Sequence, residues 1–291
     1  MYIERRYCCH DVPKTLLDCL DSHKIPYQSS KLTTIFYIRE DAPFFDEVSE
    51  MASEFASTVL RDLKFTKKEM QEATWFQMSS KCGKVETIDY DFTFSKSCTR
   101  TIMYRETKLE FAHHLHQVAP YRVQRLIKWK QKNNFYGDAC GGHYKIFCSD
   151  VARSILEEKT NGVAFMPVLK GKTEDHLPNI QQLVFSNKLP HEALILPKET
   201  MVELCPQCRE PRYKPPNTGY FYMGVKEECL RQDIDFYITE TYFGDGQGYP
   251  VIVVSRKIYE LFTKEFPERN LVFIPVFVDK RTNTQGNGSS V

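Results

Sequence analysis

The sequence predicts an α/β or α+β protein, in which a separate N-terminal α/β unit precedes a duplicated strand–helix–strand unit. The first observation behind this prediction is an internal repeat. Residues 135–168 align with residues 242–276 when one residue is gapped in the first loop and two in the later helix-to-strand turn, which places Ser149 on Ser255. The second observation is that each copy has the apolar pattern of a short strand, an amphipathic helix and another strand. A period of this kind indicates a repeated structural unit.

The elements of the two copies follow from composition and capping residues. Strands are expected at Tyr144–Cys148 and Val163–Val168 in the first copy, and at Val251–Val254 and Leu271–Val276 in the second. Ser149 and Ser255 are expected as helix N-caps, because a serine hydroxyl accepts a hydrogen bond from an amide of the first turn. The order predicts either a crossover between paired parallel strands or two flanking strands that do not pair directly.

The first hundred residues are expected to form a separate unit. Its strands are expected at Tyr2–Cys8, Leu32–Ile38, Trp75–Ser79 and, from polar/apolar alternation, Ile88–Phe94; its helices are expected at Val12–Leu20, Phe45–Leu63 and Lys67–Ala73. Thr66 and Glu69 have the spacing of a capping box, in which each side chain satisfies the other residue's backbone amide.

These patterns divide the chain into four parts. The predicted limits are 1–100 for the N-terminal unit, 101–195 for the first repeat unit, 196–280 for the second repeat unit with its CxxC knuckle, and 281–291 for the tail. The tail is polar and rich in Gly and Ser, so it is expected to be disordered.

Composition and charge narrow the class of protein. The 291 residues are 42% hydrophobic and 26% charged, which is typical of soluble globular proteins. A net charge of +1 provides no long-range field for nucleic acid or an anionic membrane. The chain has no apolar run of membrane-spanning length, and its N-terminus lacks the apolar core of a signal peptide. We therefore expect a cytoplasmic protein whose ten cysteines are mostly reduced thiols.

The strongest chemical signal is Cys205-Pro-Gln-Cys208. Two thiolates at this spacing can bind one zinc ion, and a structural zinc site needs four ligands. Cys229, Cys82, Cys140 or a histidine would have to complete it. The alternatives are a plain turn of reduced cysteines and a redox pair, although nothing places this motif between a strand and a helix, as thioredoxin-like chemistry requires.

Two acidic turns occupy equivalent positions in the repeat. Asp138 is followed by His143 in the first copy, and Asp245 begins the corresponding turn of the second. These side chains are compatible with two interpretations. One is the active site of a metal-dependent hydrolase or nuclease. The other is a pair of ordinary turns, in which Asp and Gly tolerate unusual backbone angles. The sequence contains no nucleophile elbow, phosphate-binding loop, dinucleotide fingerprint or HExxH motif.

The arrangement over about residues 135–280 resembles a bacterial family named for its double CxxCG motifs. The shared features are a CPxC knuckle, a following strand, an FG-containing turn, the segment VIVVS with a helix, and a closing F-x-P-V. The chain departs from the family pattern, because Cys208 is followed by Arg209 instead of glycine and only one knuckle is complete. The resemblance implies Cys205 and Cys208 as metal ligands and implies no catalytic residue.

Members of that family are encoded beside polymorphic toxins and act as immunity proteins. The resemblance and the duplication together predict a non-enzymatic protein-binding module that neutralises a cognate bacterial toxin by covering its active site. The alternative is the metal-dependent hydrolase or nuclease that uses Asp138, His143 and Asp245.

Overall fold

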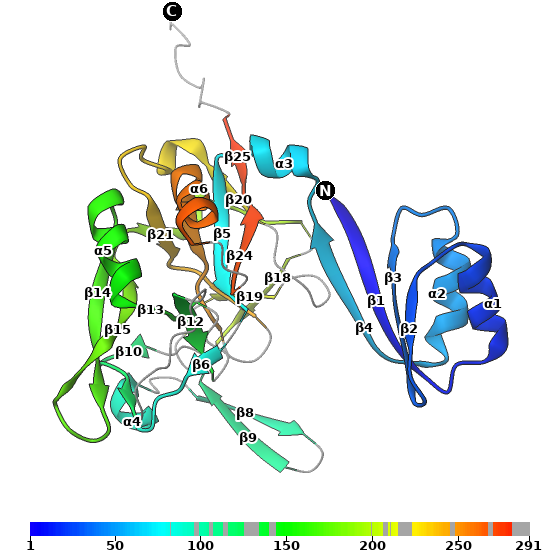
Figure 1. The fold of residues 1–291 in the computed structure, drawn as a ribbon, viewed down its shortest axis with the longest axis horizontal. Coiled ribbons are helices and arrows are strands. Elements are labelled where there is room, and N and C mark those ends of the chain that lie inside the picture. The colour runs from blue at the N-terminus through cyan, green and yellow to red at the C-terminus, as the bar shows by residue number, and fades with distance from the viewer. Residues whose placement is uncertain are drawn as a thin grey trace, which may run out of the picture. The chain divides into compact units, whose positions relative to one another are not determined.

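The computed structural model describes residues 1–81, 83–95, 99–104, 107–112, 116–124, 134–139, 144–198, 200–205, 209, 211–214, 223–244, 248–266 and 270–280. The chain forms two compact units, Met1–Glu72 and Ala73–Lys214 with Met223–Val291 (Figure 1). Both units combine helices with β-sheets, antiparallel in the first unit and mixed in the second, which confirms the predicted fold class. The finer domain limits at residues 100, 195 and 280 remain predictions, and the tail lies outside the described residues.

The N-terminal unit is a four-stranded antiparallel sheet with two helices. Its elements are β1 (Tyr2–His10), α1 (Lys14–Ser22), β2 (Tyr27–Ser29), β3 (Thr33–Arg39), α2 (Phe45–Ser53), β4 (Ala56–Lys64) and α3 (Lys67–Glu72). The strand order β2-β3-β1-β4 gives the split βαβ topology of ferredoxin-like folds. Figure 1 shows α1 and α2 on one side of this sheet. Its core contains buried residues from the sheet and both helices, among them Tyr7, Leu16, Phe36 and Val48.

Two predicted elements are wrong, and each error has a local cause. The helix expected over Phe45–Leu63 ends at Ser53, because the following segment pairs with β1 as strand β4. The strand expected over Ile88–Phe94 is instead the short helix α4 (Tyr90–Thr93). Asp89 caps that helix by accepting a hydrogen bond from the Phe92 amide at 3.2 Å. The capping side chain therefore outweighs the alternating pattern.

The predicted capping box before α3 is confirmed. The Thr66 amide donates to Glu69 Oε2 at 2.8 Å, and the Glu69 amide donates to Thr66 Oγ1 at 3.2 Å.

The second unit contains two large sheets and several small ones. Its strands before the repeat are β5 (Trp75–Ser80), β6 (Gly83–Val85), β7 (Phe94–Ser95), β8 (Thr99–Tyr104), β9 (Thr107–Ala112), β10 (His116–Gln117) and β11 (Arg122–Val123). The middle of the chain forms β12 (Phe135–Asp138), β13 (Ile146–Cys148), α5 (Asp150–Lys159), β14 (Val163–Lys170), β15 (His176–Phe185) and β16 (Lys188–Leu189). The 3-10 helix η1 (His191–Ala193), β17 (Leu194–Ile195), β18 (Met201–Leu204), β19 (Pro211–Lys214), β20 (Gly224–Lys226) and the 3-10 helix η2 (Glu227–Cys229) follow. The last elements are β21 (Phe236–Thr239), β22 (Tyr242–Phe243), β23 (Ile252–Ser255), α6 (Arg256–Glu265), β24 (Leu271–Pro275) and β25 (Phe277–Asp279).

The larger sheet has the order β11-β14-β15-β13-β12-β6, and the other large sheet has the order β16-β21-β23-β5-β24. Smaller sheets have the orders β17-β20-β25, β18-β19-β22, β10-β7 and β8-β9.

The two repeat copies have the same strand–helix–strand topology, β13–α5–β14 and β23–α6–β24. In each copy the flanking strands do not pair directly, because one antiparallel strand lies between them: β15 in the first copy and β5 in the second. The register is also shared. Pro167 lies opposite Gln181, and the equivalent Pro275 lies opposite Phe76. The structure therefore selects the second of the two predicted arrangements, in which the flanking strands are parallel without being neighbours.

The inserted strands show that the two halves of this unit exchange a strand. β5 lies in the sheet of the second copy and leads into β6, which pairs in parallel with β12 of the first. β15 lies in the sheet of the first copy and leads into β16, which pairs in parallel with β21 of the second. The duplicated unit is thus longer than the aligned segments, and each half begins with a strand that completes the other half's sheet.

The two predicted serine caps differ in their bonding. Ser149 is confirmed as a side-chain cap, since its Oγ accepts a hydrogen bond from the Ala152 amide at 3.3 Å. Ser255 has the extended backbone of an N-cap but makes no capping bond, and its hydroxyl donates to Asp235 Oδ1 at 2.8 Å. The predicted side-chain cap at Ser255 is therefore wrong, because its hydroxyl is directed toward the buried Asp235 carboxylate and accepts no bond from the first turn of the helix. Among the described residues, no helix is long and apolar enough to cross a membrane.

Candidate functional site

The CxxC motif lies in the connection of the β18–β19 hairpin. Cys205 directly follows β18 and is buried, and its carbonyl accepts a hydrogen bond from the Arg209 amide at 2.9 Å. Arg209 has a φ of 59°, which lies in the left-handed region of the backbone. Cys208 lies outside the described residues. Within the part of the chain that is described, no cluster of three potential ligands includes Cys205, so the zinc site at Cys205 and Cys208 remains a prediction.

The acidic turn of the first copy is tied into the core. Asp138 is buried at the end of β12, and its Oδ2 accepts a hydrogen bond from the Tyr121 hydroxyl at 3.1 Å. Its amide donates to the Lys145 carbonyl at 3.1 Å, which closes the loop between β12 and β13. His143 and Asp245 lie outside the described residues. The carboxylate of Asp138 is therefore bonded to the side chain of Tyr121, whereas its backbone amide makes the contact with Lys145.

A cleft of about 510 Å³ lies between the two large sheets of the second unit. Its walls include Tyr144 and Lys145 beside β13, Gln182 on β15, and Thr239 on β21. The segment in which β15 leaves the first sheet and joins the second as β16 also lines it. The strand exchange therefore builds the cleft.

Lys145 is a cation in this cleft whose pKa is strongly perturbed. Burial lowers the pKa of Lys145 to about 8, and the negative charge of Asp138 acts in the opposite direction. The ammonium donates to Gln117 Oε1 at 2.9 Å. Gln117 and Gln182 also bond to each other through their amide groups at 2.7 Å. The cleft can therefore hold a ligand's anionic or carbonyl oxygen against a cation that protein groups already orient.

An exposed apolar edge lies on strand β18. Met201, Val202 and Leu204 expose 61%, 56% and 64% of their surface, and β18 is the outer strand of the order β18-β19-β22. Large apolar side chains on an unpaired strand edge favour pairing with another chain.

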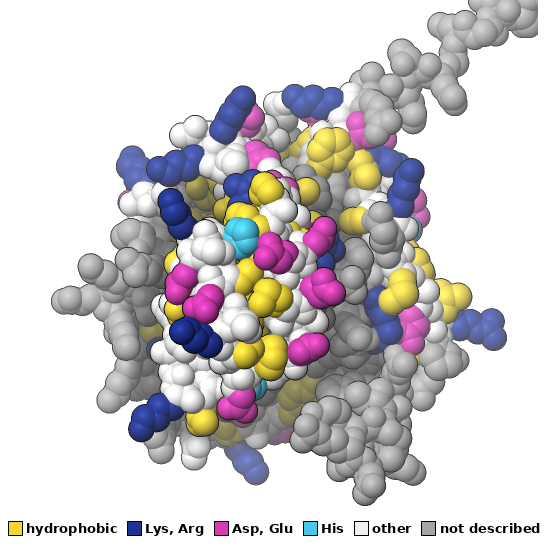
Figure 2. Space-filling model, turned by 90° about the vertical axis from the view of Figure 1, so that its right-hand side faces the viewer, with side chains coloured by type: hydrophobic (Ala, Val, Ile, Leu, Met, Phe, Trp, Pro, Cys, Tyr) yellow, Lys and Arg dark blue, Asp and Glu magenta, His cyan; other side chains and the backbone are white. Residues whose placement is uncertain are grey.

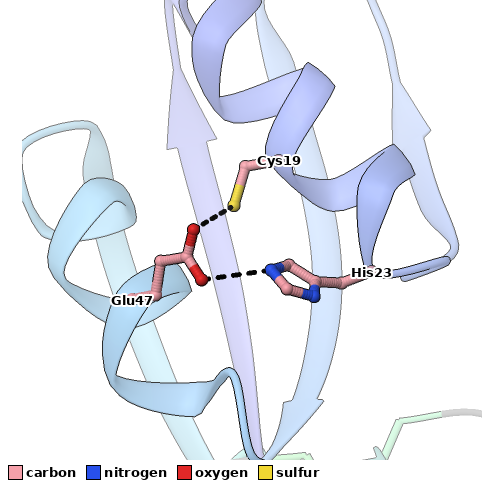
Figure 3. A group of neighbouring side chains, drawn as sticks. All are labelled: Cys19, His23 and Glu47. Atoms are coloured by element: carbon pink, nitrogen blue, oxygen red, sulfur yellow. Dashed lines mark hydrogen bonds and ion pairs between the residues drawn. The ribbon is translucent and has the colours of Figure 1, made fainter.

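Three side chains of the N-terminal unit form a group that could hold a metal ion: Cys19, His23 and Glu47 (Figure 3). Cys19 and His23 lie at the end of α1, and Glu47 lies in the first turn of α2. The Cys19 thiol lies 3.8 Å from Glu47 Oε1, and His23 Nε2 lies 3.1 Å from Glu47 Oε2. Burial, followed by the neighbouring Glu47 carboxylate, raises the pKa of the Cys19 thiol.

Sequence reasoning missed both the Lys145 cleft and the Cys19 group. Lys145 carries no sequence signal, because its burial depends on the exchanged strand. Cys19 and His23 do carry a sequence signal, since residues four apart lie on the same side of a helix.

A comparison with protein-family models, with curated proteins and with solved structures found no match to the chain.

Proposed function

We propose that the protein is a non-enzymatic binding module whose partner protein adds a strand to the outer edge of β18. The observation that carries this proposal is the row of exposed apolar side chains at Met201, Val202 and Leu204. In strand addition, backbone hydrogen bonds supply affinity and alternating side chains supply specificity. Val202 and Leu204 point to the same face of the strand, so together they offer an apolar surface to an incoming strand.

The one charged side chain of β18 does not block another strand from pairing with this edge. Proteins commonly block exposed edges with charged side chains, and the charged residue of β18 is Glu203. Arg212 and Lys214, both on β19, form ion pairs with its carboxylate. Burial alone would raise the pKa of Glu203, but the hydrogen bonds from these two cations lower it to about 2. Glu203 is therefore engaged with the neighbouring strand, and the apolar side chains are left to face a partner.

A structural zinc ion at Cys205 and Cys208 forms part of the proposal. The motif closes the hairpin that carries the exposed edge, so an ion held there would fix the edge strand against β19. The hydrogen bond from the Arg209 amide to the Cys205 carbonyl supports this role, because it joins the two sides of the motif. The ion would stabilise the hairpin and would take no part in a reaction.

The cleft lies close enough to belong to the same interface. Tyr242 lines the cleft and belongs to β22, the third strand of the β18-β19-β22 sheet. Neighbouring strands are about 4.8 Å apart, so β18 and β22 lie about 10 Å apart. An interface of ordinary size spans both features. Lys145 in the cleft would then receive an acidic side chain of the partner.

The partner that the family resemblance suggests is a cognate bacterial toxin in the cytoplasm, neutralised by occlusion. The burial of Asp138 and its bond from Tyr121 weigh against the alternative of a hydrolase or nuclease that uses this carboxylate. The immunity function accordingly requires a preformed surface and no turnover.

The test first asks whether a toxin-like gene neighbours the gene for this protein, and then co-expresses the two genes. Leu204→Lys places a charge on the edge, and Leu32→Lys is the matched control, because Leu32 in the N-terminal unit is 72% exposed. We expect the wild type and the control to neutralise toxicity, whereas Leu204→Lys loses at least tenfold in affinity for the purified toxin. Equal affinity of all three proteins would exclude the β18 edge. Sedimentation that shows a dimer broken by Leu204→Lys would instead assign the edge to a second copy of this chain and contradict the proposal.

A further inference from the structure

We propose that Cys19, His23 and Glu47 bind one zinc ion between helices α1 and α2 of the N-terminal unit. This site is independent of the CxxC motif and of the proposed binding function. It combines a thiol, an imidazole and a carboxylate, which are the three ligand types that zinc accepts. A hard cation such as Mg²⁺ or Ca²⁺ prefers oxygen ligands, so the donor set favours zinc over either.

The distances suit a tetrahedral ion. Zinc bonds of about 2.0–2.3 Å separate neighbouring ligand atoms in a tetrahedron by about 3.3–3.6 Å. The carboxylate oxygens of Glu47 lie 3.8 Å from Cys19 Sγ and 3.1 Å from His23 Nε2, and the ligand atoms all lie within 4.8 Å of one another. Figure 3 shows the three side chains pointing toward one another from the two helices. The upper limit of 4.8 Å exceeds the tetrahedral separation by about 1.3 Å, so side-chain rotations that close this difference would bring all three ligand atoms into contact with one ion.

The backbone fixes the end of α1 on which two ligands lie. The Ile25 amide donates to the Leu20 carbonyl at 2.9 Å, and Lys24 between them has a φ of 56°. This is a Schellman ending, in which one left-handed residue terminates the helix. The His23 amide also donates to the Cys19 carbonyl at 3.2 Å, so the two ligands keep their i,i+4 relation up to the last turn.

The imidazole is oriented by packing as well. Its ring stacks on Phe44, with ring centroids 4.5 Å apart and an interplanar angle of 21°. Phe44 directly precedes α2 and packs against the core of the unit. An imidazole held in this way loses little rotational freedom when it binds an ion, which favours affinity.

The surrounding surface attracts cations. Acidic side chains gather on the face formed by α1 and α2, as Figure 2 shows. The two helices carry five exposed carboxylates and one exposed basic side chain: Asp18, Asp21, Asp46, Glu47, Glu50 and Lys14. A surface with one sign of charge raises the local concentration of the opposite ion.

The exposure of the ligands and the protonation of the thiol indicate how an ion would bind here. The thiol is buried, whereas the Glu47 side chain is 60% exposed, so the fourth position of the ion faces solvent. Water or a side chain of another protein would occupy it. Zinc binding replaces the thiol proton, which passes to solvent, so affinity rises with pH.

The experiment titrates the full-length protein with Co²⁺ and then with Zn²⁺. Cys205→Ser with Cys208→Ser serves as the background, so that the CxxC thiols cannot contribute. We expect one equivalent of Co²⁺ to produce the thiolate-to-cobalt charge-transfer band, and one equivalent of Zn²⁺ to remove it. Glu47→Gln should weaken binding at least tenfold, because loss of an outer-shell partner alone typically costs 10- to 100-fold. Glu50→Gln, an exposed carboxylate on the same helix, is the matched control and should bind as the background does.

Cys19→Ser should abolish the charge-transfer band, with circular dichroism used to check that the core still folds. Because Glu47 is exposed, Glu47→Gln tests the site even if Cys19→Ser does not fold. The proposal is overturned if the band fails to appear at one equivalent, or if Glu47→Gln and Glu50→Gln bind cobalt equally well.

Discussion

Replacing Lys145 by Met should stabilise the protein at neutral pH. The folded chain lowers the pKa of this amine from 10.5 to about 8 because it is buried. A tenfold change in proton affinity is worth about 1.4 kcal/mol, so the difference corresponds to a folding cost of about 3 kcal/mol. Because the effective dielectric constant at such sites is higher than that of a dry interior, we expect a gain of only about 1–2 kcal/mol for Lys145→Met. Gln117 Oε1 keeps an acceptor role in the variant, since Gln182 still donates to it at 2.7 Å.

The pH dependence of this gain in stability tests whether it comes from removing the buried charge. Below pH 8 the amine is protonated in both the folded and the unfolded chain, and the full cost of burying the charge is present. Between pH 8 and about 10.5 the unfolded chain binds one more proton than the folded chain, so the stability of the wild type rises with pH. The advantage of Lys145→Met should therefore be largest near pH 7 and vanish near pH 10.5.

Urea unfolding of both proteins across pH 6–10.5 measures this difference in unfolding free energy. Lys188→Met is the matched control, because Lys188 lines the same cleft but is exposed, and it should change stability by less than about 0.5 kcal/mol. A difference between Lys145→Met and wild type that stays constant with pH would refute the reasoning.

Two further predictions concern the scaffold. Ser255→Asp would place a second carboxylate beside the buried Asp235, whose Oδ1 lies 2.8 Å from the present hydroxyl. This variant should lose at least about 2 kcal/mol more unfolding free energy than Ser149→Asp, where an aspartate can still cap the helix. Urea unfolding measures both variants, and equal losses would contradict the assigned roles. Gly83→Ala would bring its Cβ to 2.5 Å from the Asp138 carbonyl oxygen and should cost about 1–3 kcal/mol; an unchanged melting temperature would show that this strand contact is looser than the structure has it.

The repeat was predictable because its information is local. A β-branched strand, a serine and an apolar helix face are visible within about thirty residues, and both copies fold as these patterns indicate. The capping box at Thr66 and Glu69 was predictable for the same reason. Two local signals compete over Ile88–Phe94. The alternation of polar and apolar residues predicts a strand, but the capping side chain of Asp89 favours the helical turn that forms.

The parts that were not predictable depend on partners distant in sequence. Nothing in Trp75–Ser80 indicates that this strand is inserted between β23 and β24, almost two hundred residues later. The predicted helix over Phe45–Leu63 is too long for a similar reason. Its second half forms strand β4 because it pairs with the distant strand β1. The burial of Lys145 and the approach of Glu47 to Cys19 also follow from tertiary packing, so periodicity could not reveal either site.

The two places where the chain passes from one large sheet to the other differ in packing, and the cleft around Lys145 lies at one of them. At the β5-to-β6 crossing, the backbone of Gly83 packs so closely against Asp138 that a side chain has no room. At the β15-to-β16 crossing, the equivalent passage lines the cleft that contains Lys145. The copies share strand register and topology, so this difference arises from the residues at the crossings and not from the fold. Two halves with the same topology can therefore differ at their crossings, and among the described residues the cleft around Lys145 lies at the β15-to-β16 crossing.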